Sequence, residues 1–84
     1  MNQKLHITLY GTAHCHLCEE AESLILQLHN TLPLVLKKID IMDDAALFEQ
    51  YQTSIPVLRD NQTNTYLYWP FTSQEIYLFL SQHK

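Results

Sequence analysis

The sequence is poor in positive charge and has no long apolar run, and each shortage argues against a class of protein. It carries 5 Lys and Arg residues against 9 Asp and Glu residues, for a net charge of −4. Because the cations are scattered, they form no basic stripe that could neutralise successive phosphates, and a nucleic acid is not an expected partner. No apolar run approaches the ~18 residues of a bilayer span, so no membrane segment is expected.

Cysteine is also scarce, with only Cys15 and Cys18 present. The first residues alternate between polar and apolar and lack the apolar segment of a signal peptide, which predicts a cytoplasmic location. Thiols stay reduced in that compartment, so two cysteines close together indicate catalysis or metal binding more than a structural bridge. Covalent haem attachment is excluded, because Glu19 stands where that motif needs histidine.

The chain is long enough for one hydrophobic core, and we predict a single domain over residues 1–84. Alternating apolar residues predict a first strand over about residues 4–10, which ends at Gly11, the only glycine. An apolar stripe with helical spacing then predicts a helix that begins at Cys15. The apolar segment 34–41 predicts a buried, central strand.

The next segments predict a short helix and a hairpin. Asp43 or Asp44 can cap the helix. Segments 55–59 and 65–69 flank a turn-rich loop and predict two antiparallel strands. The inner face of the short helix is expected to carry three side chains, those of Leu47, Phe48 and Tyr51.

The last helix has a clear start signal. Thr72-Ser73-Gln74-Glu75 is a capping box, and Phe71 is placed to pack against Ile76 as a hydrophobic staple. The full order is β-α-β-α-β-β-α. A right-handed β-α-β crossover followed by a hairpin predicts an α/β fold with a four-stranded mixed sheet and helices on both faces.

This order, with Cys15-x-x-Cys18 after a strand and Ile55-Pro56 about forty residues later, resembles the thioredoxin and glutaredoxin superfamily over essentially the whole chain. More narrowly, residues 10–21, Tyr51, and residues 55–58 and 69–71 are similar to a family of small glutaredoxin-like proteins. The resemblance implies a thioredoxin-like fold and a thiol–disulfide oxidoreductase.

Thiol–disulfide exchange needs one thiolate to attack and a second thiol to resolve the mixed disulfide, and a two-residue spacer at a helix start supplies both. We assign Cys15 as the nucleophile, stabilised by the helix start, and Cys18, one turn into the helix, as the resolving thiol. His14 and His16 flank the nucleophile. Protonated imidazoles there would favour the thiolate and make the protein more oxidising; the alternative is that both are solvated loop residues.

Substrate binding is expected at two further places. By resemblance, Pro56 follows a cis peptide bond beside the cysteines, and the backbone of Ile55 is free to pair with an extended substrate. The alternative is that Pro56 begins an edge strand, where proline is tolerated. The N–H groups of Thr72 and Ser73, at a helix start, are expected to bind a substrate carboxylate. The expected partner is a protein disulfide or a small thiol, and the expected state is a monomer.

The sequence also departs from true glutaredoxins. That family usually has a proline after the first cysteine, a lysine three residues before it and a Gly-Gly pair ahead of the last helix. Here those places hold His16, Thr12 and Trp69-Pro70. The lysine and the glycine pair help to hold glutathione in that family. We therefore expect no bound cofactor; glutathione stays open as a reductant, although these departures argue against it.

Two other functions stay open. The run His14-Cys15-His16-Leu17-Cys18 offers thiolate and imidazole ligands that suit zinc or copper, or an iron–sulfur cluster bridged between two chains. A closed zinc site normally needs a second ligand pair far along the chain, which the other histidines do not form. The third possibility is a thioredoxin-fold binding protein without turnover, because function depends on the site and not on the fold.

Overall fold

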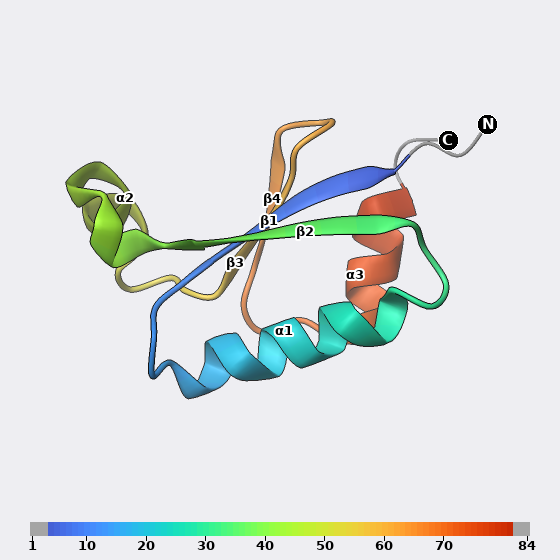
Figure 1. Cartoon of the computed structure of the whole chain (residues 1–84), viewed down its shortest axis with the longest axis horizontal. Coiled ribbons are helices and arrows are strands. Elements are labelled where there is room, and N and C mark those ends of the chain that lie inside the picture. The colour runs from blue at the N-terminus through green and yellow to red at the C-terminus, as the bar shows by residue number, and fades with distance from the viewer. Residues whose placement is uncertain (1–3, 82–84) are drawn as a thin grey trace.

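The computed structural model describes residues 4–81, and its elements follow the predicted order (Figure 1). One short 3₁₀ helix, η1, precedes the second α-helix. The elements are β1 (Leu5–Gly11), α1 (His16–Leu28), β2 (Leu34–Asp40), η1 (Ile41–Asp43), α2 (Ala45–Tyr51), β3 (Val57–Asp60), β4 (Thr65–Tyr68) and α3 (Ser73–Leu80).

The four strands form one mixed sheet in the order β2-β1-β3-β4. β1 runs parallel to β2 and antiparallel to β3, and β3 and β4 form the antiparallel hairpin. β2 is thus an edge strand, and the prediction of a central position for segment 34–41 was wrong. Leu34 is buried in the core beneath α1, and Leu36 packs against that core. Burial of one face of the strand, without a central position, explains its apolar composition.

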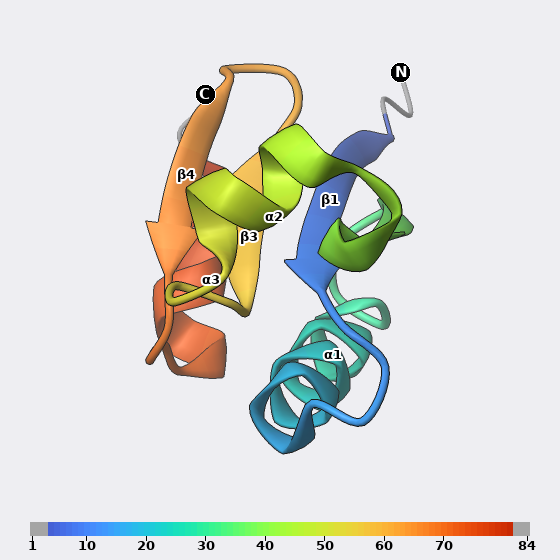
Figure 2. The ribbon, with the colours of Figure 1, turned by 90° about the vertical axis from the view of Figure 1, so that its left-hand side faces the viewer.

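Helices cover both faces of the sheet, as predicted (Figure 2). Ile7 and Leu9 belong to the main core beneath α1 and α3. Tyr10 faces the other way because successive strand residues alternate between the two faces. On that second face, Tyr51 of α2 stacks on Tyr10 with ring centroids 4.8 Å apart.

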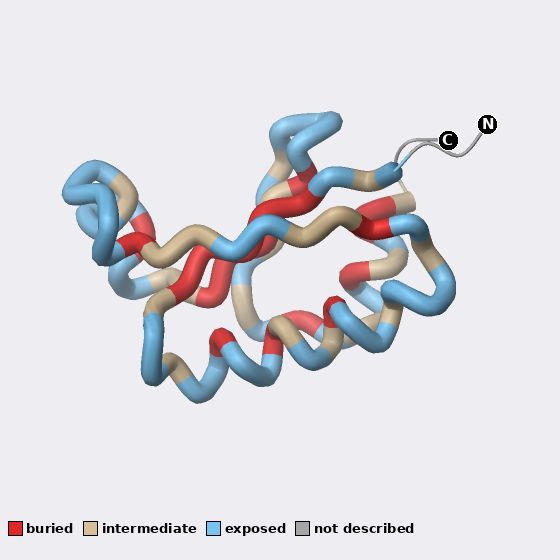
Figure 3. The backbone as a smooth tube through the Cα atoms, in the orientation of Figure 1, coloured by how far each residue is buried: buried red, intermediate tan, exposed pale blue. Residues whose placement is uncertain are grey.

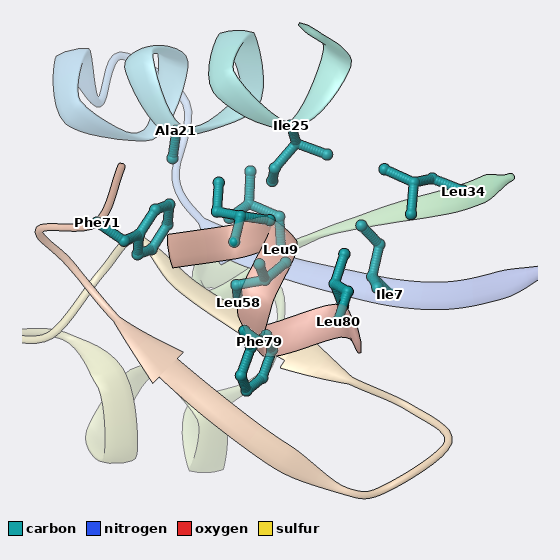
Figure 4. Packing of buried hydrophobic residues seen from close by; sticks show 10 residues of the cluster. Ile7, Leu9, Ala21, Ile25, Leu34, Leu58, Phe71, Phe79 and Leu80 are labelled. Carbon is teal, nitrogen blue, oxygen red and sulfur yellow. The ribbon is translucent and has the colours of Figure 1, made fainter. Parts of the chain in front are cut away.

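The main core lies between the sheet and the α1–α3 layer, where buried positions concentrate (Figure 3). Figure 4 shows Phe71 close to Ala21, so the start of α3 packs beside the early turns of α1. The buried apolar side chains of the main core are Ile7, Leu9, Ala21, Ile25, Leu34, Leu58, Phe71, Ile76, Phe79 and Leu80.

Local predictions about two helix starts, those of α3 and α2, are confirmed. The Oγ1 of Thr72 accepts the N–H of Glu75 at 3.1 Å, and the Oε1 of Glu75 accepts the N–H of Thr72 at 2.9 Å. Phe71 and Ile76, the expected staple pair, are both buried in the main core. The carboxylate of Asp44 caps α2 by accepting two backbone N–H groups.

The inner face of α2 is narrower than expected. Leu47 and Tyr51 pack on the sheet, but Phe48 is 38% exposed, so its placement on the inner face was wrong. Leu47 and Tyr51 are four residues apart and lie along one line of the helix, whereas Phe48 is turned about 100° from Leu47. Among residues 4–81, none of the helices has the length and apolar character needed to cross a membrane.

Candidate functional site

The strand register brings three connecting segments to one end of the sheet. Tyr10 pairs with Val57, which pairs in turn with Tyr68. The loop after β1, the residues before β3 and the residues after β4 therefore lie at the same end. The cysteines, Ile55-Pro56 and Trp69-Pro70 occupy these three segments.

The two cysteines lie where the loop after β1 enters α1. Cys15 is the N-cap residue, and its Sγ accepts the backbone N–H of Cys18 at 3.1 Å. The helix thus begins within one residue of the predicted start. A disulfide joins Cys15 to Cys18, whose Cα atoms are 5.2 Å apart.

The two sulfurs differ in exposure. Cys18 is 8% exposed, whereas Cys15 is only partly buried. An incoming disulfide therefore has better access to Cys15, and the helix N-terminus favours a negative charge on that sulfur. This arrangement suits Cys15 to attack and Cys18 to resolve.

Gly11, the last residue of β1, contributes to this site in a way that the sequence analysis missed. A Cβ atom at this position would lie 2.8 Å from the Sγ of Cys18 and 3.1 Å from its Cβ. The sequence pattern predicts only the end of a strand at Gly11. The available signal was that the chain's single glycine stands four residues before Cys15.

The two flanking histidines take different positions. His16 is the first residue of α1; its side chain is 86% exposed, and its Nε2 lies 3.6 Å from a carboxylate oxygen of Glu20. His14 has a φ of 63°, in the left-handed region, and lines a pocket together with Cys18. The imidazole of His16 is thus paired with a carboxylate, while His14 shares a pocket with a cysteine.

The Ile55-Pro56 peptide bond is cis, as the resemblance implied. Pro56 is buried, and the strand that follows it lies between β1 and β4, so the alternative of an edge strand does not hold. The N–H of Ile55 donates to the carbonyl of Tyr51 at 3.2 Å. The backbone of Ile55 is therefore not wholly free, and pairing with a substrate would use its carbonyl group.

The start of α3 is also less open than expected. The N–H of Thr72 is not free, because the carboxylate of Glu75 accepts it within the capping box. A capping box and a free Thr72 N–H, both expected from the sequence, are therefore incompatible. A substrate carboxylate at this helix start would have to use Ser73, the first residue of α3.

A pocket of about 320 Å³ adjoins Cys18 on the β2 side. Lys38 and Glu22, which both line this pocket, form an ion pair, with the Nζ of Lys38 3.2 Å from a carboxylate oxygen of Glu22. Its lining comes from the end of β1, the loop after it, the first turns of α1 and the end of β2: Leu9, Gly11, Thr12, Ala13, His14, Cys18, Glu19, Glu22, Lys38, Ile39 and Asp40.

The structure shows no preassembled metal centre in the part of the chain that it describes. Among residues 4–81, no three or more His, Cys, Asp and Glu side chains are grouped so that they could hold a metal ion.

Comparisons with known proteins agree with this geometry. Residues 6–81 match the family model of the glutaredoxin-like domain (DUF836). The X-ray structure of protein XcR50 from X. campestris is 33% identical to the chain, with a TM-score of 0.81, over 93% of this chain and 99% of that one. The solution NMR structure of protein Ne2328 from Nitrosomonas europaea is 27% identical, with a TM-score of 0.82, over 96% of each chain. No curated protein matches the chain. The chain therefore belongs to the glutaredoxin-like family (DUF836) and has a thioredoxin-like fold.

Proposed function

We propose that the chain is a thiol–disulfide oxidoreductase in which Cys15 and Cys18 alternate between dithiol and disulfide. One observation carries the proposal: the Sγ of Cys15 caps α1 and accepts the N–H of Cys18 at 3.1 Å. A sulfur in this place is stabilised as a thiolate by the unpaired N–H groups of the first helical turn. Its resolving partner already lies within bonding distance.

The reaction follows from the difference in exposure. The Cys15 thiolate attacks one sulfur of a substrate disulfide, forms a mixed disulfide and releases the other sulfur as a thiolate. Cys18 then loses its proton and attacks the Cys15 sulfur, which releases the second substrate thiol and closes the intramolecular disulfide. The substrate gains two electrons, and the protein loses two. An external thiol or dithiol returns the protein to its reduced state by the reverse steps.

The substrate class is a protein disulfide or a small thiol. The carbonyl of Ile55, beside the buried Pro56, supports pairing with an extended substrate at the end of the sheet where the cysteines lie. Ser73 is the residue that would contact a substrate carboxylate. We assign tuning of the cysteine pair to His14, because His14 shares a pocket with Cys18, whereas the Nε2 of His16 lies beside the carboxylate of Glu20.

A redox titration tests the proposal. The purified protein is equilibrated across dithiol/disulfide buffers, and its thiol state is read by alkylation and mass, with Cys15→Ser as the control. We expect a single two-electron transition at a potential accessible to cellular thiols. Failure to form the Cys15–Cys18 disulfide at any such potential would refute the proposal.

A further inference from the structure

The end of β1 contains a space that a side chain would normally fill. At Gly11 the position of a Cβ atom is only 2.8 Å from the Sγ of Cys18, closer than real Cβ contacts allow. The sulfur of the resolving cysteine therefore occupies the volume that any other residue at position 11 would need.

The backbone gives no other reason for glycine at this position. Gly11 lies in a regular strand, pairs with Asp40 on β2, and is not among the residues with positive φ. Its conformation is one that ordinary residues adopt, so the turn-forming freedom of glycine is not used here. The contact with Cys18 is the feature that requires the missing side chain.

The contact matters differently in the two redox states. In the disulfide, the bond to Cys15 fixes the sulfur of Cys18, which cannot turn away from position 11. In the dithiol, the Sγ of Cys18 can move away by a change of rotamer, whereas the approach to the Cβ of Cys18, at 3.1 Å, is the same in both states. Cys18 also lines the pocket of about 320 Å³, which offers the displaced thiol a place to go. A methyl group at position 11 would therefore oppose the disulfide more than the dithiol.

We propose that Gly11 is a positioning residue of the redox couple: by leaving room for the Cys18 sulfur, it favours the disulfide over the dithiol. The inference rests on the proposed redox function and deepens it. Gly11 takes no part in electron transfer, and it acts by deciding where the resolving sulfur can lie when it is bonded to Cys15.

The test compares the reduction potentials of wild type and Gly11→Ala in the same redox buffers. We expect the equilibrium constant for disulfide formation to fall about tenfold in Gly11→Ala, which corresponds to a potential about 30 mV more positive. The control is Ile25→Val, a buried substitution on α1 about two turns beyond Cys18. It should destabilise both redox states equally and leave the potential unchanged.

The outcomes separate this inference from the proposed function. If wild type forms no disulfide, the oxidoreductase proposal fails. If wild type titrates normally and Gly11→Ala has the same midpoint, only the role of Gly11 is refuted. A shift of equal size in Ile25→Val would also refute it, because the potential would then follow general stability.

A second measurement decides the matter even if Gly11→Ala does not fold. In the Cys18→Ala background the 2.8 Å contact with the sulfur is absent and only the 3.1 Å contact with the Cβ remains, so Gly11→Ala should cost less stability in urea unfolding than it does in the oxidised wild type. Recovery of a folded protein in the double variant supports the contact. An equal loss in both backgrounds, or a double variant that stays unfolded while Cys18→Ala folds, contradicts it.

Discussion

Tyr51 makes the free energy of unfolding depend on pH in the alkaline range. Its side chain is 3% exposed, stacks on Tyr10 at 4.8 Å and lies 6.4 Å from the ring of Tyr66. Burial, together with the hydrogen bond and the charge of Tyr66 nearby, raises the pKa of Tyr51 to about 12. The neutral phenol is thus favoured in the folded protein.

The direction of the change in stability follows from when Tyr51 loses its proton in the folded and in the unfolded chain. The unfolded chain loses the Tyr51 proton near its ordinary pKa of about 10, before the folded chain does. The stabilising contribution is therefore complete below pH 10 and is lost as the pH rises from about 10 to about 12. At about 1.4 kcal/mol per pKa unit, the loss in the free energy of unfolding is at most about 2–3 kcal/mol.

Urea unfolding of the oxidised protein between pH 8 and pH 12 measures this loss, since disulfide-bonded cysteines do not titrate. Tyr51→Phe should lower stability at pH 8 and remove this part of the decline at alkaline pH. Tyr77→Phe is the matched control, because Tyr77 lies on α3, apart from the ring contacts among Tyr10, Tyr51 and Tyr66. This variant should keep the wild-type dependence of stability on pH. An identical alkaline decline in wild type and Tyr51→Phe would refute the reasoning.

Two further predictions concern the capping box and the cysteines. Thr72→Ala removes the acceptor of the Glu75 N–H and should lower the free energy of unfolding by about 1 kcal/mol, or Tm by about 5 °C. The control Thr53→Ala, in an exposed turn, should change stability little. Equal stability of the two variants in calorimetry would contradict the role of the cap. Cys18→Ser should accumulate a mixed disulfide with a model substrate at Cys15, while Cys15→Ser should trap at least tenfold less, because Cys18 is 8% exposed. Equal trapping by the two variants, read by mass, would show that the assignment of nucleophile and resolving thiol is wrong.

Much of the fold was predictable because its signals are local. The alternation at the start of the chain, the apolar stripe of α1, the Asp44 cap and the capping box at Thr72 each depend on residues a few positions apart. The placement of Cys15-x-x-Cys18 at a helix start is equally local. These signals were sufficient for the order of elements and for the position of the two cysteines at a helix start.

Other features depend on which segments meet in space. The edge position of β2, the exposure of Phe48 and the stacking of Tyr10 on Tyr51 follow from packing between distant segments. The hydrogen bonds that occupy the N–H groups of Ile55 and Thr72 further limit the predicted substrate contacts.

By itself, the sequence determined the elements, their order and the Cys15-x-x-Cys18 motif, since hydrogen bonding within a helix turn or a capping box involves near neighbours. Only the tertiary structure decided what surrounds that motif. The role of Gly11 is the clearest case: a glycine at the end of a strand has many explanations, and the close approach of the Cys18 sulfur selects one. That approach exists because β1 and α1 pack together, and van der Waals exclusion acts between atoms wherever they lie in the chain.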